Sequence, residues 1–234
     1  MGLTALDSVV VAPYGGRVDV GISVVNRGSS TMASSFVEVV SEVGLLVRVV
    51  VEGVRVGERR EIRIRLELQR PGIHTLQAVV VFEGDEDPTN DSDTFVVQVP
   101  APPGAVVIAE VMAAPAEPAP EWIEVVNRTA WELDLLGWRI RDRRGTEGEI
   151  VLRLLLRPGE RAVLCEDEAA FQLAYAGSVQ LSQPDRWPSL NNLEDSVTLV
   201  DVVGLAVDSV EYVDAGAGRS LERIREGEGG GGSR

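Results

Sequence analysis

The amino-acid sequence predicts an all-β protein. Val dominates the apolar residues, Gly and Pro are plentiful, and no long stretch repeats at the period of a helix. Several short stretches alternate apolar and polar side chains and then break at Asn, Gly or Asp, which is typical of half-buried antiparallel strands. The chain has 234 residues, enough for two domains that each bury a core of their own.

A proline-rich segment divides the chain. Residues 100–104 read Pro-Ala-Pro-Pro-Gly and stand between two expected strands, at residues 94–99 and 106–111. Closely spaced prolines favour extended polyproline geometry, which makes a short, semi-rigid connector. We therefore predict a first domain at residues 1–99, a linker at 100–104, a second domain at 105–225 and a Gly-rich flexible tail at 226–234.

The first half of the chain contains the clearest strand pattern. Residues 61–68 place charged side chains on one face, where opposite signs can pair across strands. The other face is apolar and consists of Ile62, Ile64, Leu66 and Leu68. Residues 18–25 alternate in the same way before a turn at Asn26. Pro71 and Gly72 are expected to turn the chain into a return strand at residues 73–82.

The order of motifs in residues 3–99 resembles a known family. It runs V-x-V-x-I-x-V-V-N-R-G, then V-x-V-G-E-R-R-E-I-x-I, then P-G-x-H-T-L-x-A-V-V, then an acidic D-P-T-N-D turn. This order is similar to that of the bacterial cell-adhesion-related (CARDB-type) immunoglobulin-like domain. The resemblance implies an immunoglobulin-like β-sandwich for residues 1–99.

Residues 105–225 resemble the lamin tail domain. The motifs are E-W-I-E-V-V-N, L-L-G-W-R-I-R-D, W-P-S-L-N-N, S-V-T-L-V-D and V-D-S-V-E-Y, in that order. The resemblance implies a second immunoglobulin-like β-sandwich, which is a binding and spacing module and not a catalyst. The sequence departs from the family where Glu194 precedes Asp195 in place of the frequent Gly, and in lacking the segment that usually follows S-L-E-R-I.

All four tryptophans fall in this second half. Large amphipathic rings in a β-sandwich usually pack in the core, with the indole N–H bonded to a carbonyl group. We expect this role for Trp122, Trp138 and Trp187. Trp131 lies in a predicted turn region, and we assign it neither to the core nor to the surface.

The formal charge of the chain is −15, and all 22 basic residues are Arg. Such an acidic surface repels phosphate at long range, which disfavours nucleic acid and anionic membranes as partners. One local basic stripe consists of Arg139, Arg141, Arg143, Arg144, Arg153, Arg157 and Arg161. Acidic residues are interspersed among these arginines, so we predict an ion-paired sheet face. No apolar run is long enough for a transmembrane helix.

The residue types that most often carry catalysis are scarce. The single histidine, His74, and the single cysteine, Cys165, fall in different predicted domains, so neither a nucleophile–base pair nor a zinc site is expected. His74 is predicted to end a strand. Cys165 is predicted to fill a strand end, with its pKa raised by the acidic residues that follow it.

Two pairs of carboxylates suggest glycoside chemistry at first sight. Glu121 with Glu124, and Asp185 with Asp195, supply the acids, but no apolar pocket that would raise the pKa of one of them is evident. We therefore predict that the chain is not an enzyme and needs no organic cofactor.

The acidic turn at residues 85–93 is the one candidate metal site. Its possible calcium ligands are Asp85, Asp87, Asn90, Asp91 and Asp93. Calcium takes six to eight oxygen ligands, yet Asp and Asn also form turns by bonding their own backbone. The sequence is compatible both with a calcium site and with a solvated turn at these residues.

From these observations we expect a non-catalytic binding, adhesion or spacer segment of a bacterial cell-surface or secreted protein. Its partner would be a protein or a cell-envelope polymer. Residues 1–4 carry no signal-peptide pattern, so an export signal would lie upstream. The alternatives are an accessory module of an exported hydrolase, whose catalytic domain lies outside this chain, and an intracellular lamin-like scaffold.

Overall fold

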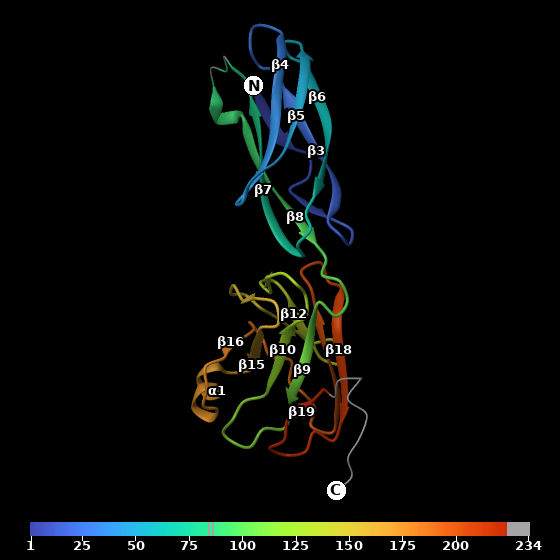
Figure 1. The fold of residues 1–234 in the computed structure, drawn as a ribbon, viewed down its shortest axis with the longest axis vertical. Coiled ribbons are helices and arrows are strands. Elements are labelled where there is room, and N and C mark those ends of the chain that lie inside the picture. Colours follow the sequence, from blue (N-terminus) through green and yellow to red (C-terminus); the bar gives the residue numbers. More distant parts are fainter. Residues whose placement is uncertain (84, 86, 224–234) are drawn as a thin grey trace. The chain divides into compact units, whose positions relative to one another are not determined.

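The computed structural model describes residues 1–83, 85 and 87–223. The chain divides into two compact units, Met1–Ala101 and Pro102–Arg234, and the division falls inside the proline-rich segment. We call them unit 1 and unit 2. Both are built from strands (Figure 1), and the predicted all-β class with two immunoglobulin-like sandwiches is confirmed. The predicted tail at residues 226–234 lies outside the described residues.

Unit 1 contains two sheets. Sheet 1A has the antiparallel order β1-β3-β6, with β1 (Gly2–Ala5), β3 (Arg17–Val25) and β6 (Arg59–Glu67). Sheet 1B has the order β2-β8-β7-β4-β5, with β2 (Val9–Val11), β8 (Ser92–Val99), β7 (Gly72–Val81), β4 (Met32–Ser41) and β5 (Gly44–Val54). Strand β2 is parallel to β8, and the other neighbours are antiparallel. A 3-10 helix, η1 (Pro88–Asn90), lies between β7 and β8.

The core of unit 1 lies between these two sheets. Ile22 and Ile64 of sheet 1A pack in one cluster with Val37, Leu76 and Phe95 of sheet 1B. The alternation predicted for residues 18–25 and 61–68 holds, because the predicted inward residues are buried or half-buried. On the outward face Arg65 pairs with Asp19 at 2.8 Å and Arg17 with Glu67 at 3.3 Å, as the charged pattern predicted.

The turn at Pro71 and Gly72 does not form a hairpin. Strand β6 belongs to sheet 1A and β7 to sheet 1B, so the chain crosses from one sheet to the other at this point. The strand expected at residues 73–82 is present as β7, but it lies in the sheet opposite β6. Alternating strands of a sandwich have one buried face whichever sheet they join, so the pattern alone does not select the pairing partner.

Unit 2 also contains two main sheets. Sheet 2A has the order β16-β15-β10-β9-β19, with β16 (Gln180–Ser182), β15 (Arg161–Cys165), β10 (Trp122–Asn127), β9 (Val106–Met112) and β19 (Leu221–Glu222). Sheet 2B has the order β13-β12-β17-β18, with β13 (Glu147–Glu149), β12 (Arg139–Arg141), β17 (Glu194–Val200) and β18 (Ala206–Val213). A short ladder joins β11 (Leu133–Asp134) to β14 (Leu155–Leu156).

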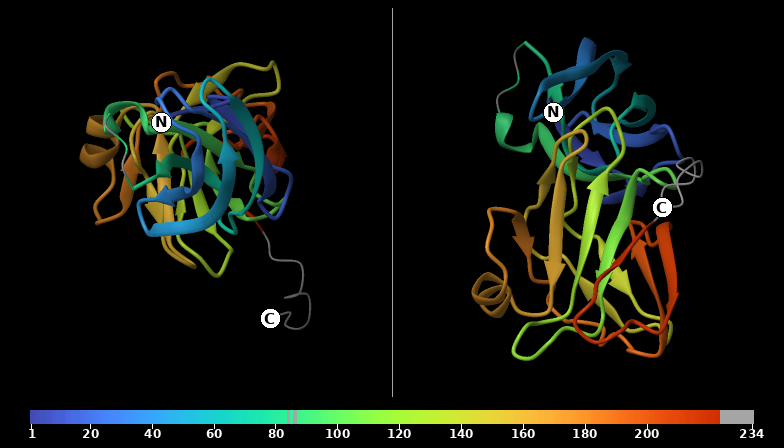
Figure 2. Two further views of the ribbon diagram at one scale, coloured as in Figure 1. Left: turned by 90° about the horizontal axis from the view of Figure 1, so that it is seen from above. Right: turned by 60° about the horizontal axis from the view of Figure 1, so that its bottom comes forward.

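One helix, α1 (Glu168–Ala174), covers part of the outer face of sheet 2A (Figure 2, right). Asp167 caps its first turn by accepting a bond from the N–H of Ala170 at 2.9 Å. Phe171 of the helix and Tyr175 beyond it pack edge-on against Trp122, with ring centroids 6.0 and 5.9 Å apart. Cys165 lies in the same small cluster.

The tryptophans confirm part of the prediction. Trp122 and Trp138 are buried, Trp187 is half-buried and Trp131 is exposed. The expected bonds to carbonyl groups are wrong, however. The indole N–H groups of Trp122 and Trp138 have no hydrogen-bond partner among the described residues, and that of Trp187 donates to a carboxylate. Packing of the ring outweighs the lost bond at the first two positions.

Both units contain the same buried asparagine arrangement. Asn26 follows β3 in unit 1, and Asn127 ends β10 in unit 2. The Nδ2 group of Asn26 donates to the carbonyls of Ser30 and Val54 at 2.8 and 2.9 Å. The Nδ2 group of Asn127 donates in the same way to Trp131 and Leu156, at 2.8 Å each.

A glycine turn completes each arrangement. The N–H of Asn26 donates to the carbonyl of Glu58, and its carbonyl accepts from Gly57. Asn127 makes the equivalent bonds with Glu160 and Gly159. Gly57 and Gly159 have φ values of 75° and 76°, a conformation that favours glycine. We call these two arrangements the asparagine corners.

Candidate functional site

The predicted calcium ligands lie around the connection from β7 to β8, but they engage different partners. Asp87 caps η1, where its Oδ1 accepts from the N–H of Thr89 at 3.2 Å and its Oδ2 from Asn90 Nδ2 at 2.9 Å. Asp93 accepts from the N–H of Ala5 in β1 at 2.9 Å. These three side chains therefore serve turn geometry and strand docking.

Asp85 and Asp91 form a separate pair around the amino group of Met1. The ammonium donates a hydrogen bond to Asp85, and it lies 3.7 Å from Asp91 Oδ1. Asp91 is 9% exposed, and this burial, followed by the nearby Asp85 carboxyl, raises the pKa of Asp91 to about 6. Burial also works to raise the pKa of Asp85, but its hydrogen bonds outweigh that effect and hold the pKa below its usual value.

The hydrogen bonds at Asp87 have the opposite effect to burial. Donation from Thr89, and then from Asn90, holds the pKa of Asp87 below its usual value, so this carboxyl stays ionised over a wide pH range. Among the described residues, no group of three His, Cys, Asp or Glu side chains is arranged to hold a metal ion. Calcium binding by this turn stays a prediction.

The W-P-S-L-N-N motif forms the best-connected loop of unit 2, residues 183–193, which we call the Trp187 loop. Glu121, just before β10, fastens its middle. One carboxylate oxygen, Oε2, accepts from Trp187 Nε1 at 2.7 Å and from the N–H of Leu190 at 2.9 Å. Burial is the main cause of a raised pKa at Glu121, which these two bonds oppose. The loop is thereby tied to sheet 2A.

The same loop is also tied to sheet 2B. Asp185 and Glu149 of β13 exchange two bonds, from the N–H of each residue to an oxygen of the other, at 2.9 and 2.7 Å. The backbone approaches β13 so closely that a Cβ at Gly148 would meet the carbonyl oxygen of Arg186 at 1.8 Å. Glycine is required there because no side chain fits between the two segments.

The end of the loop is fixed by Asp195 and Tyr212. The Asp195 carboxylate accepts from the N–H groups of Asn191, Ser196 and Arg143, at 2.8, 2.8 and 3.1 Å. The Tyr212 hydroxyl donates to the carbonyl of Asn191 at 3.0 Å, and burial raises the pKa of this hydroxyl. The loop therefore links the two sheets through side-chain and backbone bonds.

This geometry accounts for the carboxylates that the sequence offered as acid pairs. Glu121, Asp185 and Asp195 each hold the Trp187 loop, while Glu124 pairs with Arg161. The arrangement can fasten two sheets together. The sequence signal for this role was the W-P-S-L-N-N motif itself.

Cys165 and His74 have structural settings. Cys165 is fully buried, and burial, followed by the nearby Glu168 and Asp167 carboxylates, raises the pKa of its thiol to about 12. A thiol with such a pKa is protonated and a poor nucleophile at neutral pH. His74 is half-buried near the start of β7, and its Nε2 lies 2.7 Å from the carbonyl oxygen of Arg70. Both residues lie where the sequence predicted.

Five of the seven arginines of the stripe are ion-paired, which agrees with the predicted ion-paired sheet face. Arg139 and Arg141 share Glu147, at 3.4 and 2.6 Å. Further pairs join Arg143 to Glu194, Arg153 to Asp134 and Arg161 to Glu124. Each positive charge in these pairs already has a negative partner within the protein, which leaves little field to attract a phosphate backbone.

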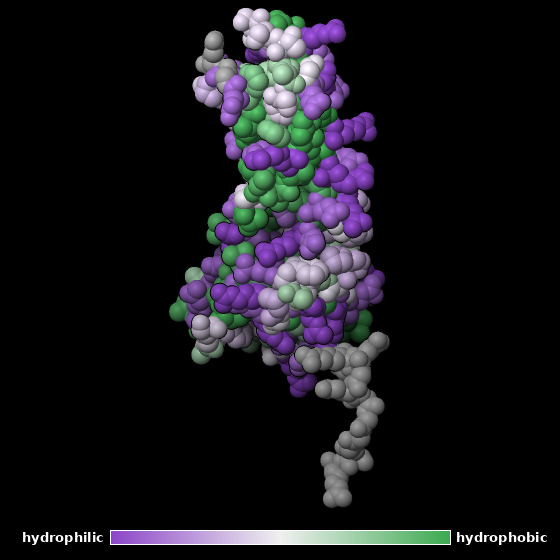
Figure 3. All heavy atoms as spheres, turned by 45° about the horizontal axis from the view of Figure 1, so that its top comes forward, coloured by the Kyte–Doolittle hydropathy of each residue, from purple (hydrophilic) through white to green (hydrophobic). Residues whose placement is uncertain are grey.

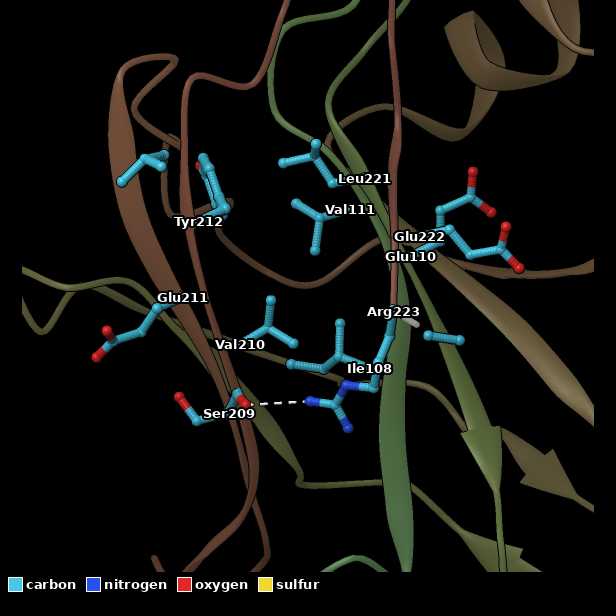
Figure 4. Close-up of a pocket in the computed structure, with 12 residues that line it drawn as sticks. Ile108, Glu110, Val111, Ser209, Val210, Glu211, Tyr212, Leu221, Glu222 and Arg223 are labelled. Carbon is cyan, nitrogen blue, oxygen red and sulfur yellow. Dashed lines mark hydrogen bonds between the residues drawn. The ribbon is translucent and has the colours of Figure 1, made fainter. Parts of the chain in front are cut away.

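Sequence reasoning did not predict the groove between β18 and β19, which Figure 4 shows. It has a volume of about 390 Å³. Apolar side chains line its interior, namely Ile108, Val111, Val210 and Leu221. Arg223 crosses one end, donating to the carbonyl of Ser209 at 3.1 Å and pairing with Asp208 at 3.0 Å. Glu110 and Glu222 point away from the groove, so it combines no acid and base.

Comparison with known proteins supports the family resemblance of unit 2. Residues 99–214 match the family model described as Lamin Tail Domain. The lamin-tail resemblance of the second half is therefore confirmed, and the family that it resembles consists of non-catalytic immunoglobulin-like domains. No curated protein matches the sequence of the chain.

Solved structures show similar folds at low identity. A CARDB domain from Pyrococcus furiosus, solved in complex with di-metal ions, is 21% identical, covers 42% of this chain and 88% of that chain, and has a TM-score of 0.34. The calcium binding domain CBD12 of CALX1.1 is 10% identical, with 85% and 80% covered and a TM-score of 0.30. A β-glucosidase from Listeria innocua is 16% identical, with 42% and 16% covered and a TM-score of 0.32. CARDB domains are among the solved structures that are similar to this chain.

Proposed function

We propose that this chain is a non-catalytic binding and spacer segment of a bacterial cell-surface or secreted protein. The observation that carries the proposal is the use of the polar side chains. The residues of the lamin-tail motifs that could do chemistry instead fasten loops and strands. A domain whose polar side chains are hydrogen-bonded within the fold in this way is suited to act as a binding surface or as a spacer.

The electrostatics support the same reading. The chain carries a formal charge of −15, and five of the seven arginines of its stripe are paired within the protein. Within the described residues no helix is long and apolar enough to cross a membrane. A partner matched to these surfaces is a protein or an uncharged or cationic cell-envelope polymer, reached through sheet faces and loops.

The location is tested in intact cells that produce the parent protein. An antibody raised against residues 1–223 should detect the segment on unpermeabilised cells or in the culture medium, and external protease should remove the cell-bound signal. A signal that only permeabilised cells give, and that external protease spares, would overturn the proposal in favour of an intracellular scaffold.

The absence of catalysis is tested with the purified chain. We expect no turnover in a panel of esterase, phosphatase, nuclease and glycosidase substrates. Turnover that Glu121→Gln or Asp195→Asn abolishes, with the melting temperature unchanged, would contradict the proposal. Activity in a longer parent protein but not in this chain would favour the accessory module of an exported hydrolase.

A further inference from the structure

The outer face of sheet 1B is apolar. Ten apolar side chains point outward from its five strands, namely Val9, Val11, Phe36, Val40, Leu46, Val50, Ile73, Val79, Val81 and Val96. Seven of them are exposed, with Val11 at 57% and Val50 at 53%. Figure 3 shows hydrophobic side chains gathered on unit 1 with hydrophilic ones along the margins. We call this surface the apolar face.

The apolar residues of this face are neighbours across strands and not isolated exposures. Phe36 of β4 is in register with Val50 of β5 and with Val81 of β7, which makes a row over three strands. Val9 of β2 is in register with Val96 of β8. Single exposed apolar residues are ordinary, but contiguous patches mark surfaces that another molecule covers.

Other outer faces of the same chain differ. Sheet 1A presents charged side chains, such as Arg65 and Asp19. Helix α1 covers part of sheet 2A, and sheet 2B presents polar residues such as Thr198 and Ser209. Sheet 1B has neither a covering helix among the described residues nor a charged ladder.

The charges on the apolar face exclude most classes of ligand. Among the described residues its titratable side chains are Glu38, Arg48 and Glu52. Arg48 Nε donates a hydrogen bond to Glu38 Oε1 at 2.6 Å, and the Arg48 guanidinium lies 5.3 Å from the Phe36 ring centroid. Within the part of this face that the structure describes, its arginine is already paired with Glu38, which leaves no free cation for phosphate or a lipid headgroup. One aromatic ring is also too few for the stacking platform that binds single-stranded nucleic acid.

We propose that the apolar face is a homotypic interface, through which two copies of this chain pack sheet against sheet. The chain carries a charge of −15 overall, but this face is nearly neutral. Two copies can therefore bring their apolar faces together with little charge repulsion between the faces themselves. A two-fold axis also allows Glu38 of each copy to approach Arg48 of the other, as an isologous interface requires. Face-to-face sheets packed about 10 Å apart bury side chains of this β-branched kind.

The size of the face meets the requirement of a weak dimer. Four strands about 4.8 Å apart, with outward residues over about eight positions at 3.3 Å each, and the shorter β2 with its 3 residues give on the order of 550 Å² per copy. Two copies would bury about 1,100 Å², just below the range of stable interfaces and within that of weak ones. We therefore expect dissociation in roughly the micromolar range. Added salt should strengthen the dimer, because it screens the repulsion between two acidic chains.

Sedimentation velocity of the whole chain tests the interface. The mass should rise with concentration from 25.2 kDa toward twice that value and no further. The triple variant Phe36→Thr, Val50→Thr, Val81→Thr keeps residue types that suit strands, and its dimer should dissociate at least tenfold more readily. The control variant Val56→Thr, Leu205→Thr, Val213→Thr changes exposed apolar residues elsewhere and should dimerise normally.

A cross-linking variant keeps the test decisive if the triple variant does not fold. Gln77 is exposed on β7, the middle strand of sheet 1B, and Cys165 is fully buried, so a new thiol would be the accessible one. Under a mild oxidant Gln77→Cys should form a covalent dimer, and Thr4→Cys on sheet 1A should not. The proposal fails if the parent chain stays monomeric at about 200 μM, if both triple variants lose association equally, if the mass grows beyond two copies, or if both thiols cross-link equally.

Discussion

Unit 1 and unit 2 share the asparagine corner and differ in what covers the outer faces of their sheets. Each contains an asparagine corner, in which a buried side-chain amide donates to two carbonyls. The backbone of the same asparagine bonds to an R-x-G-E-R turn, residues 55–59 in unit 1 and 157–161 in unit 2. Glu58 and Glu160 both accept a bond from the arginine N–H three residues earlier, at 2.8 Å. The corner is therefore a property of the fold, which both sandwiches retain.

The differences lie outside the corner. Unit 2 adds the Trp187 loop between its sheets and helix α1 over one outer face. Unit 1 lacks both among its described residues and leaves the outer face of sheet 1B apolar. The two units therefore stabilise themselves by shared or internal contacts, and they differ in the surfaces that are available to partners.

The largest expected effects come from the core aromatics, and they test whether the units unfold independently. Phe95 and Trp138 are each 1% exposed. Phe95→Ala should destabilise unit 1, and Trp138→Ala unit 2, by roughly 3–5 kcal/mol each. Differential scanning calorimetry should show one transition shifted per variant. A shift of both transitions in either variant would contradict this expectation, because the units would then unfold as one.

The asparagine corners should matter equally in both units. Asn26→Ala and Asn127→Ala each leave buried carbonyls and an N–H without their side-chain partner, which should cost roughly 2–4 kcal/mol. Chemical denaturation of each variant, with the shifted transition assigned to its unit, measures the loss. A difference of more than about 2 kcal/mol between the two variants would show that the shared geometry hides unequal roles.

Substitutions of Glu121 test the Trp187 loop, which has no counterpart among the described residues of unit 1. Glu121→Ala should cost roughly 1–3 kcal/mol in unit 2, because the N–H groups of Trp187 and Leu190 lose their acceptor. Glu121→Gln keeps an acceptor and should retain most of the stability.

The pH dependence of Glu121 has a defined sign. Its pKa is raised in the folded protein, so the folded state binds more protons, and stability falls as the pH rises from the unfolded pKa of 4.5 through the folded value. The Gln variant should lack this fall. Calorimetry over that pH range measures the fall in stability. An equal fall in the Gln variant would show that a group other than Glu121 causes it.

The acidic turn tests a feature that only unit 1 has. If it binds calcium, a tenfold excess over the dissociation constant should add about 1.4 kcal/mol to unit 1 and leave unit 2 unchanged. The double variant Asp87→Asn, Asp91→Asn should abolish the shift. Calorimetry without any shift at millimolar calcium, or with an equal shift in the double variant, would show a solvated turn only.

The smallest effect concerns the corner glutamates. Hydrogen bonds, first from the Arg55 and Arg157 backbones, hold the pKa of Glu58 and Glu160 below the usual value of 4.5. Their contribution to stability is therefore present above pH 4.5 and is lost as the pH falls through the folded pKa. Glu58→Gln and Glu160→Gln should each flatten the acid side of the stability profile slightly, one in each unit. The melting temperature of each unit, measured between pH 3 and 6, tests this expectation. An effect in one unit alone would show that the two corner glutamates do not contribute equally to stability.

The sequence predicted most of the fold and little of the site. Alternation located β3, β6, β7 and β10, and the prolines located the division between the units. The corner had a visible signal that sequence reasoning did not use, because V-V-N-R and R-x-G-E-R each occur in both halves. Helix α1 also had one, since Asp167 precedes an Ala-rich run in the manner of an N-cap.

The all-β class, the two units and the lamin-tail resemblance of unit 2 could all be predicted from the sequence. These properties follow from short-range periodicity and ordered motifs, which pleated geometry imposes directly. The placement of β6 and β7 in different sheets, and the bond from Trp187 to Glu121, became visible in the three-dimensional fold. The same holds for Phe36, Val50 and Val81, which lie side by side on an open surface. Strand pairing is a long-range choice, so the outward face of an alternating strand is known only once its neighbours are placed.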